Sequence, residues 1–300
     1  MDYSQFLGMR EELSLLAVIL LTFLIDLFVS SEKKAENCGN ECSLEGRPCA
    51  RMMWLTRVPI VLMLVHTVFN LLPYGAANEA TWTSLFGGMY LHTEMMTLIK
   101  SVLNVGALIV MVMATPYLMR KENHIKAGEF HSLLLFTLLG MYFMISAGHF
   151  LMFFIGLELA SIPMAALISF NKGCQKSGEA GAKFILLALF SSGLMLYGIS
   201  LLYGACGTLY FGQMAAALSA PNLISILGLV LVISGLGFKI SMVPFHLWTA
   251  DTYEGAPTPV TAFLSVLSKG AAAFTLMVIL TKVFSVGPFV EYWDTALQLL

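Results

Sequence analysis

The chain has 300 residues, of which 58% are hydrophobic and only 11% are charged, and its mean hydropathy is +0.82. So few polar side chains cannot cover a water-soluble fold of this size, so the composition excludes a soluble globular protein and indicates an integral membrane protein. The net charge of −2, with no basic face and no long acidic tail, gives no indication of nucleic-acid binding.

Apolar runs recur along the whole chain and reach about 20 residues, which is enough for a helix to cross a hydrocarbon core of about 30 Å. They are continuously apolar rather than alternating, which favours an all-α polytopic bundle over a β-barrel. We predict about eight transmembrane helices, at residues 13–29, 52–72, 95–118, 130–147, 149–170, 180–203, 223–248 and 260–284, with the seventh interrupted.

Local features refine the first half of this arrangement. Acids rather than basic residues precede the first run, which predicts a retained helix and not a cleaved signal peptide. Residues 80–92, rich in β-formers and glycine, are too short to span and predict a small hairpin outside the bilayer. Only SAGH, residues 146–149, separates the fourth and fifth spans, so the turn between them has to be tight.

The distribution of basic residues predicts the orientation. The first, third and fifth connections hold ten of the sixteen lysines and arginines, and the second, fourth and sixth hold none. By the positive-inside rule the odd connections are cytoplasmic and the N-terminus lies outside a bacterial inner membrane. The ten are Lys33, Lys34, Arg47, Arg51, Arg57, Arg120, Lys121, Lys126, Lys172 and Lys176. The seventh connection offers only Asp251 and Glu254, which is neutral because acids count little in this rule.

The cysteines do not predict a metal site. Cys38, Cys42 and Cys49 form a C-x3-C-x6-C pattern in the first cytoplasmic loop, without a fourth ligand or the close pairs that zinc prefers. We expect reduced thiols there and neither a metal nor a cofactor in this chain. Cys174 and Cys206 fall on opposite sides of the membrane and cannot pair.

Six charged residues fall inside the predicted spans, where each costs about 2.5–3.5 kcal/mol near the bilayer centre. Asp26 and Lys100 lie near span ends, so we expect their side chains to reach toward the interface. Lys183 is about one turn inside its span, which leaves snorkelling and a functional role equally open. The other three, Glu158, Lys239 and Lys269, are central and need a buried partner or a water-filled cavity.

These central residues are suited to a proton relay. Burial and a movable carboxylate act in opposite directions on a lysine, so the amine exchanges its proton near neutral pH, whereas an arginine would remain charged. Pro244 breaks the seventh span, and such a break is tolerated where it lines a cavity. His246 beside the break is either a proton-exchanging group or a neutral side chain bonded to the freed carbonyls.

The sequence GFKISMVPFHLWTADTYEGAPTPVTAFLSVLSKGAAAF closely resembles the seventh and eighth helices of the antiporter-like subunits of respiratory complex I, the NADH:quinone oxidoreductase. The segments FIGLELASIPMAALISF and EAGAKFILLALFSSG resemble their fifth and sixth helices. Among the paralogues, FGGMY, LELASIP and EAGAKF are most similar to subunit N. The motifs occur in the right order over roughly residues 85–280, whereas the first 80 residues are similar only in character.

The resemblance assigns roles to the charged residues. Glu158 and Lys239 match the glutamate and lysine whose ion pair is thought to drive the protonation changes, and Lys183 matches a lysine beside that pair. Lys269 matches the lysine that links the first half-channel to the central hydrophilic axis. The resemblance also implies a broken seventh helix. The remaining motif positions are His246, Pro257 and Pro259.

The implied function is that of a proton-translocating subunit without a redox centre of its own. It would work with other membrane subunits in the lipid bilayer, while NADH and quinone act through those partners. Family members have about fourteen helices in two inverted repeats. We therefore expect N-terminal helices in residues 1–120 with a polar loop at 31–51, one five-helix repeat in residues 121–284, and the start of a ninth helix in residues 285–300. From the resemblance we expect the chain to be a fragment of a longer protein or a truncated copy.

Other functions remain open at this point. The same module occurs in multi-subunit sodium/proton antiporters and in membrane-bound hydrogenases. In a different class, the bundle would be an assembly scaffold that does not pump and whose buried ions are static pairs.

Overall fold

The computed structural model describes residues 4–32, 50–72, 84–119, 127–171, 173–218, 222–284 and 289–290, and a helix lies at each of the eight predicted span positions. The elements, in chain order, are α1 (Ser4–Leu7), α2 (Arg10–Glu32), α3 (Ala50–Leu71), β1 (Ser84–Leu85), the 3₁₀ turn η2 (Phe86–Gly88), β2 (Tyr90–Leu91), α4 (Glu94–Leu118), α5 (Ala127–Ile145), α6 (Phe150–Ile168), α7 (Gln175–Cys206), α8 (Phe211–Ala217), α9 (Leu223–Ile240), α10 (Trp248–Gly255), α11 (Thr258–Ala262), the π-helical turn η4 (Phe263–Ser268) and α12 (Lys269–Lys282).

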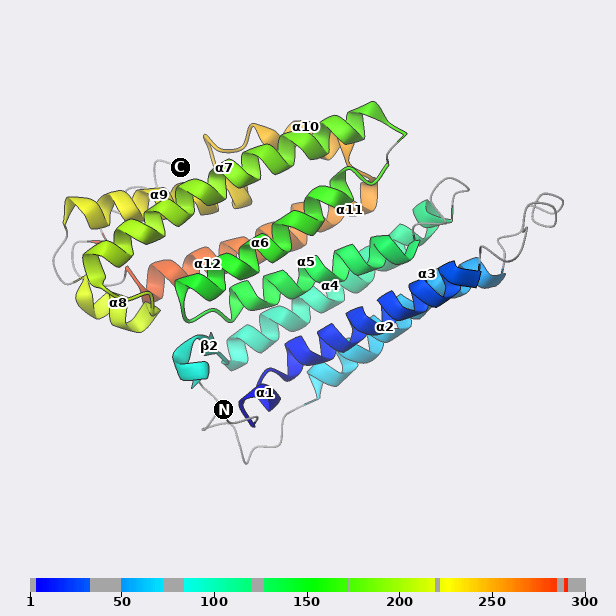
Figure 1. Ribbon diagram of the computed structural model, residues 1–300, viewed down its shortest axis with the longest axis horizontal. Helices are drawn as coiled ribbons and strands as arrows, with labels where there is room; N and C mark the ends of the chain where they lie inside the picture. The colour runs from blue at the N-terminus through cyan, green and yellow to red at the C-terminus, as the bar shows by residue number, and fades with distance from the viewer. Residues whose placement is uncertain are drawn as a thin grey trace.

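The long helices lie side by side in one bundle (Figure 1), which confirms the predicted all-α polytopic fold. Within the described ranges, six helices are long and apolar enough to cross a membrane: α4, α5, α6, α7, α9 and the continuous segment Thr258–Lys282. The apolar part of α3, Thr56–Leu71, is shorter.

Helix α5 is the centre of the bundle. Of the residues in its most apolar stretch 78% are buried, against 39–50% in the other five spans, and it packs on α2, α6 and α12. A helix with such a continuously apolar circumference is typical of a bundle core rather than of the lipid-facing layer. By packing on α2 and on α6 and α12, this helix holds the N-terminal helices and the C-terminal helices in one body.

The close packing of α5 on α6 depends on two glycines. A Cβ atom at Gly140 would lie 2.3 Å from the backbone nitrogen of Ala160, and one at Gly156 would lie 2.6 Å from that of Met144. Because the obstructing atoms belong to the backbone, the helices would have to separate. This approach of small residues is the usual way in which membrane helices gain packing contacts.

We therefore expect Gly140→Ala to lower the free energy of unfolding by about 1–3 kcal/mol, as overpacked cores do. A matched control is Gly193→Ala in α7, where a Cβ would meet nothing within 4 Å. That change should leave stability equal or raise it by up to about 1 kcal/mol through helix propensity. Denaturant unfolding in detergent micelles measures both, and equal stability of the two variants would contradict the packing argument.

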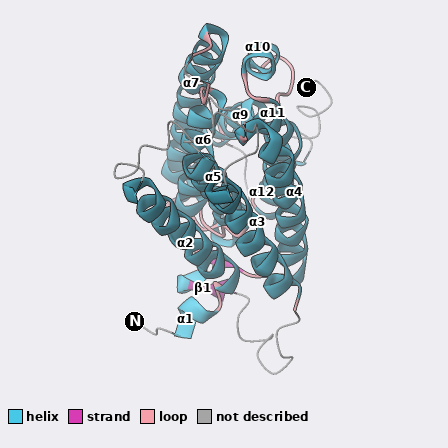
Figure 2. Cartoon of the chain, turned by 90° about the vertical axis from the view of Figure 1, so that its right-hand side faces the viewer, coloured by secondary structure: helices cyan, strands magenta, loops and turns pink. Residues whose placement is uncertain are grey.

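The predicted hairpin and tight turn are both present. Strands β1 and β2 pair antiparallel, and the turn between them places Gly87 and Gly88 at φ of +67° and +92°, a region that favours glycine. The hairpin lies beside α1 at one end of the bundle (Figure 2), where the Gln5 side chain accepts a hydrogen bond from Phe86 N at 3.1 Å. The α5–α6 turn packs on this hairpin through a bridge between Tyr90 and Ala147.

The described ends of the helices agree with alternating crossings. In Figure 1 the C-terminal ends of α2, α4 and α6 and the N-terminal ends of α3, α5 and α7 lie at the same end of the bundle. Helix α10, the predicted seventh connection, is at this end too, because Glu254 pairs with Lys176 at 2.7 Å. Which end faces the cytoplasm stays a prediction. Cys38, Cys42 and Cys49 and nearly all of residues 285–300 fall outside the described residues.

Candidate functional site

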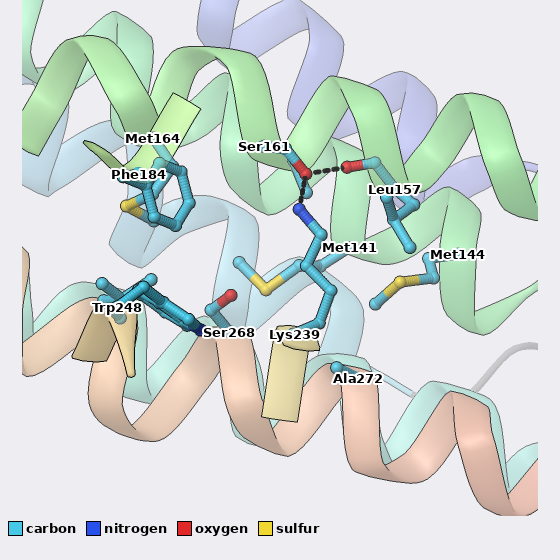
Figure 3. A pocket seen from close by; sticks show the side chains of 12 residues that line it. Met141, Met144, Leu157, Ser161, Met164, Phe184, Lys239, Trp248, Ser268 and Ala272 are labelled. Atoms are coloured by element: carbon cyan, nitrogen blue, oxygen red, sulfur yellow. Dashed lines mark hydrogen bonds between the residues drawn. The ribbon is translucent and has the colours of Figure 1, made fainter. Parts of the chain in front are cut away.

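Lys239 binds Ser161 of α6, one helical turn beyond Glu158. Lys239 lies in the last turn of α9, and its Nζ donates a hydrogen bond to Ser161 Oγ at 2.5 Å (Figure 3). Ser161 Oγ in turn donates to the backbone oxygen of Leu157 at 2.5 Å. The rings of Phe184 and Phe238 each lie 5.9 Å from the ammonium, so aromatic faces supply part of its solvation.

Glu158 lies near this lysine without touching it. In the described part of the chain the carboxylate and the ammonium are not in ion-pair contact, although Lys239 is within electrostatic range of Glu158. The Oε1 atom of Glu158 is buried and has no hydrogen-bond partner among the described residues. The ion pair implied by the resemblance is therefore not formed in this conformation. Lys239 is hydrogen-bonded to Ser161 instead.

A small cavity of about 20 Å³ adjoins Lys239. A water molecule needs roughly 10–15 Å³ of such space, so the cavity has room for one. Six elements besides α9 contribute to it, which explains why sequence proximity could not reveal it. Its lining is mostly apolar and consists of Met141, Met144, Leu157, Ala160, Ser161, Met164, Phe184, Lys239, Trp248, Leu264, Ser268 and Ala272 (Figure 3).

The predicted break in the seventh span is present. Helix α9 ends at Ile240, and Ser241 adopts a φ of +64° before the chain turns through Pro244 into α10. The freed carbonyls are satisfied locally, because Phe238 O accepts from the Trp248 indole at 3.1 Å and Gly237 O accepts from Met242 N at 2.8 Å. The cavity is lined by Lys239 before the break and by Trp248 after it, whereas Pro244 does not line it.

His246 lies on the outer side of this break. Its side chain is exposed, and its backbone oxygen accepts from Thr249 N at 3.0 Å. The freed carbonyls are bonded by Trp248 and by backbone amides rather than by the imidazole. A role in proton exchange stays a prediction.

Lys269 follows a distortion in the last span. The six residues Phe263–Ser268 form a π-helical turn, a feature that often marks functional positions because it re-aims the side chains that follow. The Lys269 ammonium lies 5.2 Å from the centre of the Tyr253 ring. Tyr253 Oη is buried and lacks a hydrogen-bond partner in the described ranges. Ser268, the residue before Lys269, lines the Lys239 cavity.

Lys183 lies apart from Lys239, in a surface cluster. Its side chain is 44% exposed, and its Nζ is 2.7 Å from both Asp251 and Glu179. Together with the Lys176–Glu254 pair, these groups surround a polar hollow of about 200 Å³ between α7 and α10. The next residue, Phe184, points to the other side and lines the Lys239 cavity.

The prediction for Lys100 was wrong. Its side chain does not reach the interface but is 1% exposed, with Nζ 2.5 Å from Glu12 Oε1 and 2.9 Å from Glu11 Oε2. The two acids come from the start of α2, so no local pattern around Lys100 could have revealed them. Asp26 is partly buried, and its carboxyl packs against Gly128 of α5.

Ser161, Trp248 and Tyr253 are the site residues that sequence reasoning missed. Ser161 alone carried a usable signal, because it follows Glu158 by three residues in LELASIP and therefore shares its helix face. Trp248 and Tyr253 reach Lys239 and Lys269 only after the chain has turned back through α10.

Residues 147–300 match the family described as NADH:quinone oxidoreductase/Mrp antiporter, TM. The whole chain is 51% identical to the NADH-quinone oxidoreductase subunit N of Phocaeicola vulgatus and covers 58% of it. Against the protein of the same name from Magnetococcus marinus, 85% of the chain is 39% identical and covers 52% of that relative. The chain thus spans a little over half the length of these relatives.

Solved structures share the fold. A chain of respiratory complex I from Thermus thermophilus aligns with a TM-score of 0.64 and 25% identity over 87% of this chain and 52% of that one. A chain of the Mrp complex from Dietzia aligns with a TM-score of 0.69 and 19% identity over 93% of this chain and 49% of that one, a likeness of fold alone. Sequence and structure agree, and the chain belongs to the transmembrane family of NADH:quinone oxidoreductase and Mrp antiporter subunits.

Proposed function

We propose that this chain supplies a proton-translocating module to a membrane complex of the NADH:quinone oxidoreductase type. Protons move along Glu158, Lys183, Lys239, His246 and Lys269, while NADH and quinone react in partner subunits. Relatives named subunit N support this assignment, and because the chain spans only part of their length, their whole activity is carried over as a proposal.

The observation that carries the proposal is the arrangement of Lys239 between two acceptors. Ser161 accepts a hydrogen bond from the ammonium. Glu158, one turn earlier on the same face of α6, has an Oε1 atom with no hydrogen-bond partner among the described residues. Moving the lysine from the neutral hydroxyl to the carboxylate favours its protonated state, and moving it back favours release. The adjoining space for one water supplies a proton acceptor. A conformational change in a partner that biases this movement would couple redox energy to proton transfer.

The other residues extend this path in both directions. The hollow around Lys183, Asp251 and Glu179 opens toward solvent and is suited to collect protons at the end that we assign to the cytoplasm. Lys269, redirected by η4, continues from the cavity on the side of Tyr253. In this assignment α5 to α12 form one five-helix repeat, with Pro244 as its helix break and the N-terminus outside.

Glu158→Gln tests the proposal. Removing the charge removes one of the two states of Lys239, so proton pumping should fall roughly tenfold. Acidification of inverted membrane vesicles during NADH oxidation measures it, with Glu94→Gln, an exposed acid at the start of α4, as the matched control. Wild-type pumping in an assembled Glu158→Gln complex would remove the basis of the relay.

The family description also names the Mrp antiporter, so a subunit of a sodium/proton antiporter is the second candidate function. The same vesicles distinguish it, because a sodium/proton antiporter subunit should show transport that depends on a sodium gradient in the absence of NADH.

A further inference from the structure

The N-terminal helices hold a second group of buried charges, in the part of the chain that precedes the region matching the family. We propose that Glu11, Glu12 and Lys100 form a second proton-binding site, which exchanges with solvent through His92. Proton binding at this site does not require translocation. Only its use in transport rests on the proposed function.

Lys100 contacts both acids, and the three side chains are only 1–3% exposed. Lys100 Nζ lies 2.5 Å from Glu12 Oε1 and 2.9 Å from Glu11 Oε2, so a single ammonium serves two carboxyl groups. Tyr90 is hydrogen-bonded to two members of this group. Its Oη donates to Glu12 Oε2 at 2.8 Å and accepts from Lys100 at 3.1 Å. Burial raises the pKa of the Tyr90 phenol well above its ordinary value, so it remains a donor.

A site with two acids and one ammonium differs from a simple buried ion pair. In a pair, protonating the acid leaves the lysine as an uncompensated buried charge, which is strongly unfavourable. Here either acid keeps Lys100 paired while the other binds a proton. The triad therefore has two charge states in which the lysine remains paired.

His92 provides a route between this site and the surface. It follows β2, is partly exposed, and lies in the electrostatic range of Glu11. Its Nδ1 atom is buried and unbonded within the described residues, and burial lowers its pKa, so the ring is neutral at pH 7. In the exchange step the carboxyl O–H bond breaks and an N–H bond forms on the ring. The products are a carboxylate and an imidazolium, and the ring returns to its neutral form when the imidazolium releases its proton to water.

The remaining polar groups around the triad define its limits. Arg10 lies at the outer edge, with its guanidinium 5.1 Å from the Phe69 ring and 3.2 Å from Leu72 O. His66 of α3 binds Ser14 and Asn70, both at 3.0 Å. On the inner side the Tyr142 ring of α5 lies 5.4 Å from Lys100 Nζ.

Tyr142 also links the triad to the Lys239 site. Its neighbours Met141 and Met144, on the same helix, line the Lys239 cavity. A single helix, α5, thus separates the two charge sites. A change of charge at the triad would act on Lys239 through this short, weakly screened path.

Difference infrared spectroscopy of the purified chain in lipid nanodiscs tests the site, because a protonated carboxyl has its own C=O stretch. We expect one such band in wild type that disappears as the pH is raised, from the acid that binds a proton while the other stays paired with Lys100. Glu11→Gln and Glu12→Gln should each abolish it. Glu158→Gln, which removes the other central acid, and Glu94→Gln, the exposed control, should retain it.

The proposal is overturned if the band survives in both Glu11→Gln and Glu12→Gln, or if wild type shows no titrating band besides one lost in Glu158→Gln. The second of these outcomes needs only wild type and Glu158→Gln, so it tests the proposal even if a triad variant does not fold. His92→Phe should slow hydrogen–deuterium exchange of the band several-fold, and an unchanged rate would exclude His92 as the route. The infrared experiment does not measure pumping, so a result that overturns the second proton-binding site does not affect the Glu158–Lys239 proposal.

Discussion

Replacing Lys100 by methionine is expected to lower the free energy of unfolding by about 3–5 kcal/mol, the usual cost of removing one partner from a buried ion pair. Methionine fills most of the space but leaves Glu11 and Glu12 without their shared cation, and both are nearly inaccessible to water. Tyr90 is the one donor that remains within hydrogen-bond distance of Glu12 in the described residues. Equilibrium unfolding of the purified protein in detergent micelles measures the change.

Two further variants separate the charge effect from a general effect of losing a lysine. Lys176→Met removes an ion pair whose lysine is 73% exposed, so stability should remain as in wild type. The triple variant Lys100→Met, Glu11→Gln, Glu12→Gln removes all three charges and should recover most of the loss. If Lys100→Met were as stable as Lys176→Met, the triad would contribute nothing to holding α2 against α4.

Replacing Lys239 by alanine is expected to reduce proton pumping by at least about 100-fold, the lower bound for losing a positioned acid–base group. Lys239 is the only ionisable side chain among the residues that line the cavity. Among the described residues, Ser161 then has no side-chain donor in contact, and Glu158 loses its nearby cation. Acidification of inverted vesicles during NADH oxidation measures the loss.

Assembly has to be measured with pumping, because a scaffold would give a different result. Native gel electrophoresis should show the complex intact in Lys239→Ala. Lys282→Ala, at the exposed end of α12, is the matched control and should pump as wild type does. Wild-type pumping by an assembled Lys239→Ala complex would favour the scaffold and exclude the relay.

Sequence alone determined the features that depend on local chemistry. Long apolar runs dictate membrane helices, since a backbone in lipid has to satisfy its own hydrogen bonds, and this gave the helical bundle. The β-formers and glycines of residues 80–92 predicted the hairpin, and Pro244 in KISMVP predicted the break after α9. Each follows from residues within a few positions of one another, which is the range over which backbone preferences act.

Tertiary structure decided which charges meet. Lys100 pairs with two acids that lie 88 and 89 positions earlier in the chain. Lys183 pairs with Asp251, which lies 68 positions later, and Lys239 is hydrogen-bonded to a serine 78 positions earlier. Side chains near a span end are free to extend to water or to turn inward, and the local sequence is the same in both cases. The choice depends on which helices pack beside them, and that is set by the close contact of α5 with α6 and the burial of α5 on nearly all sides.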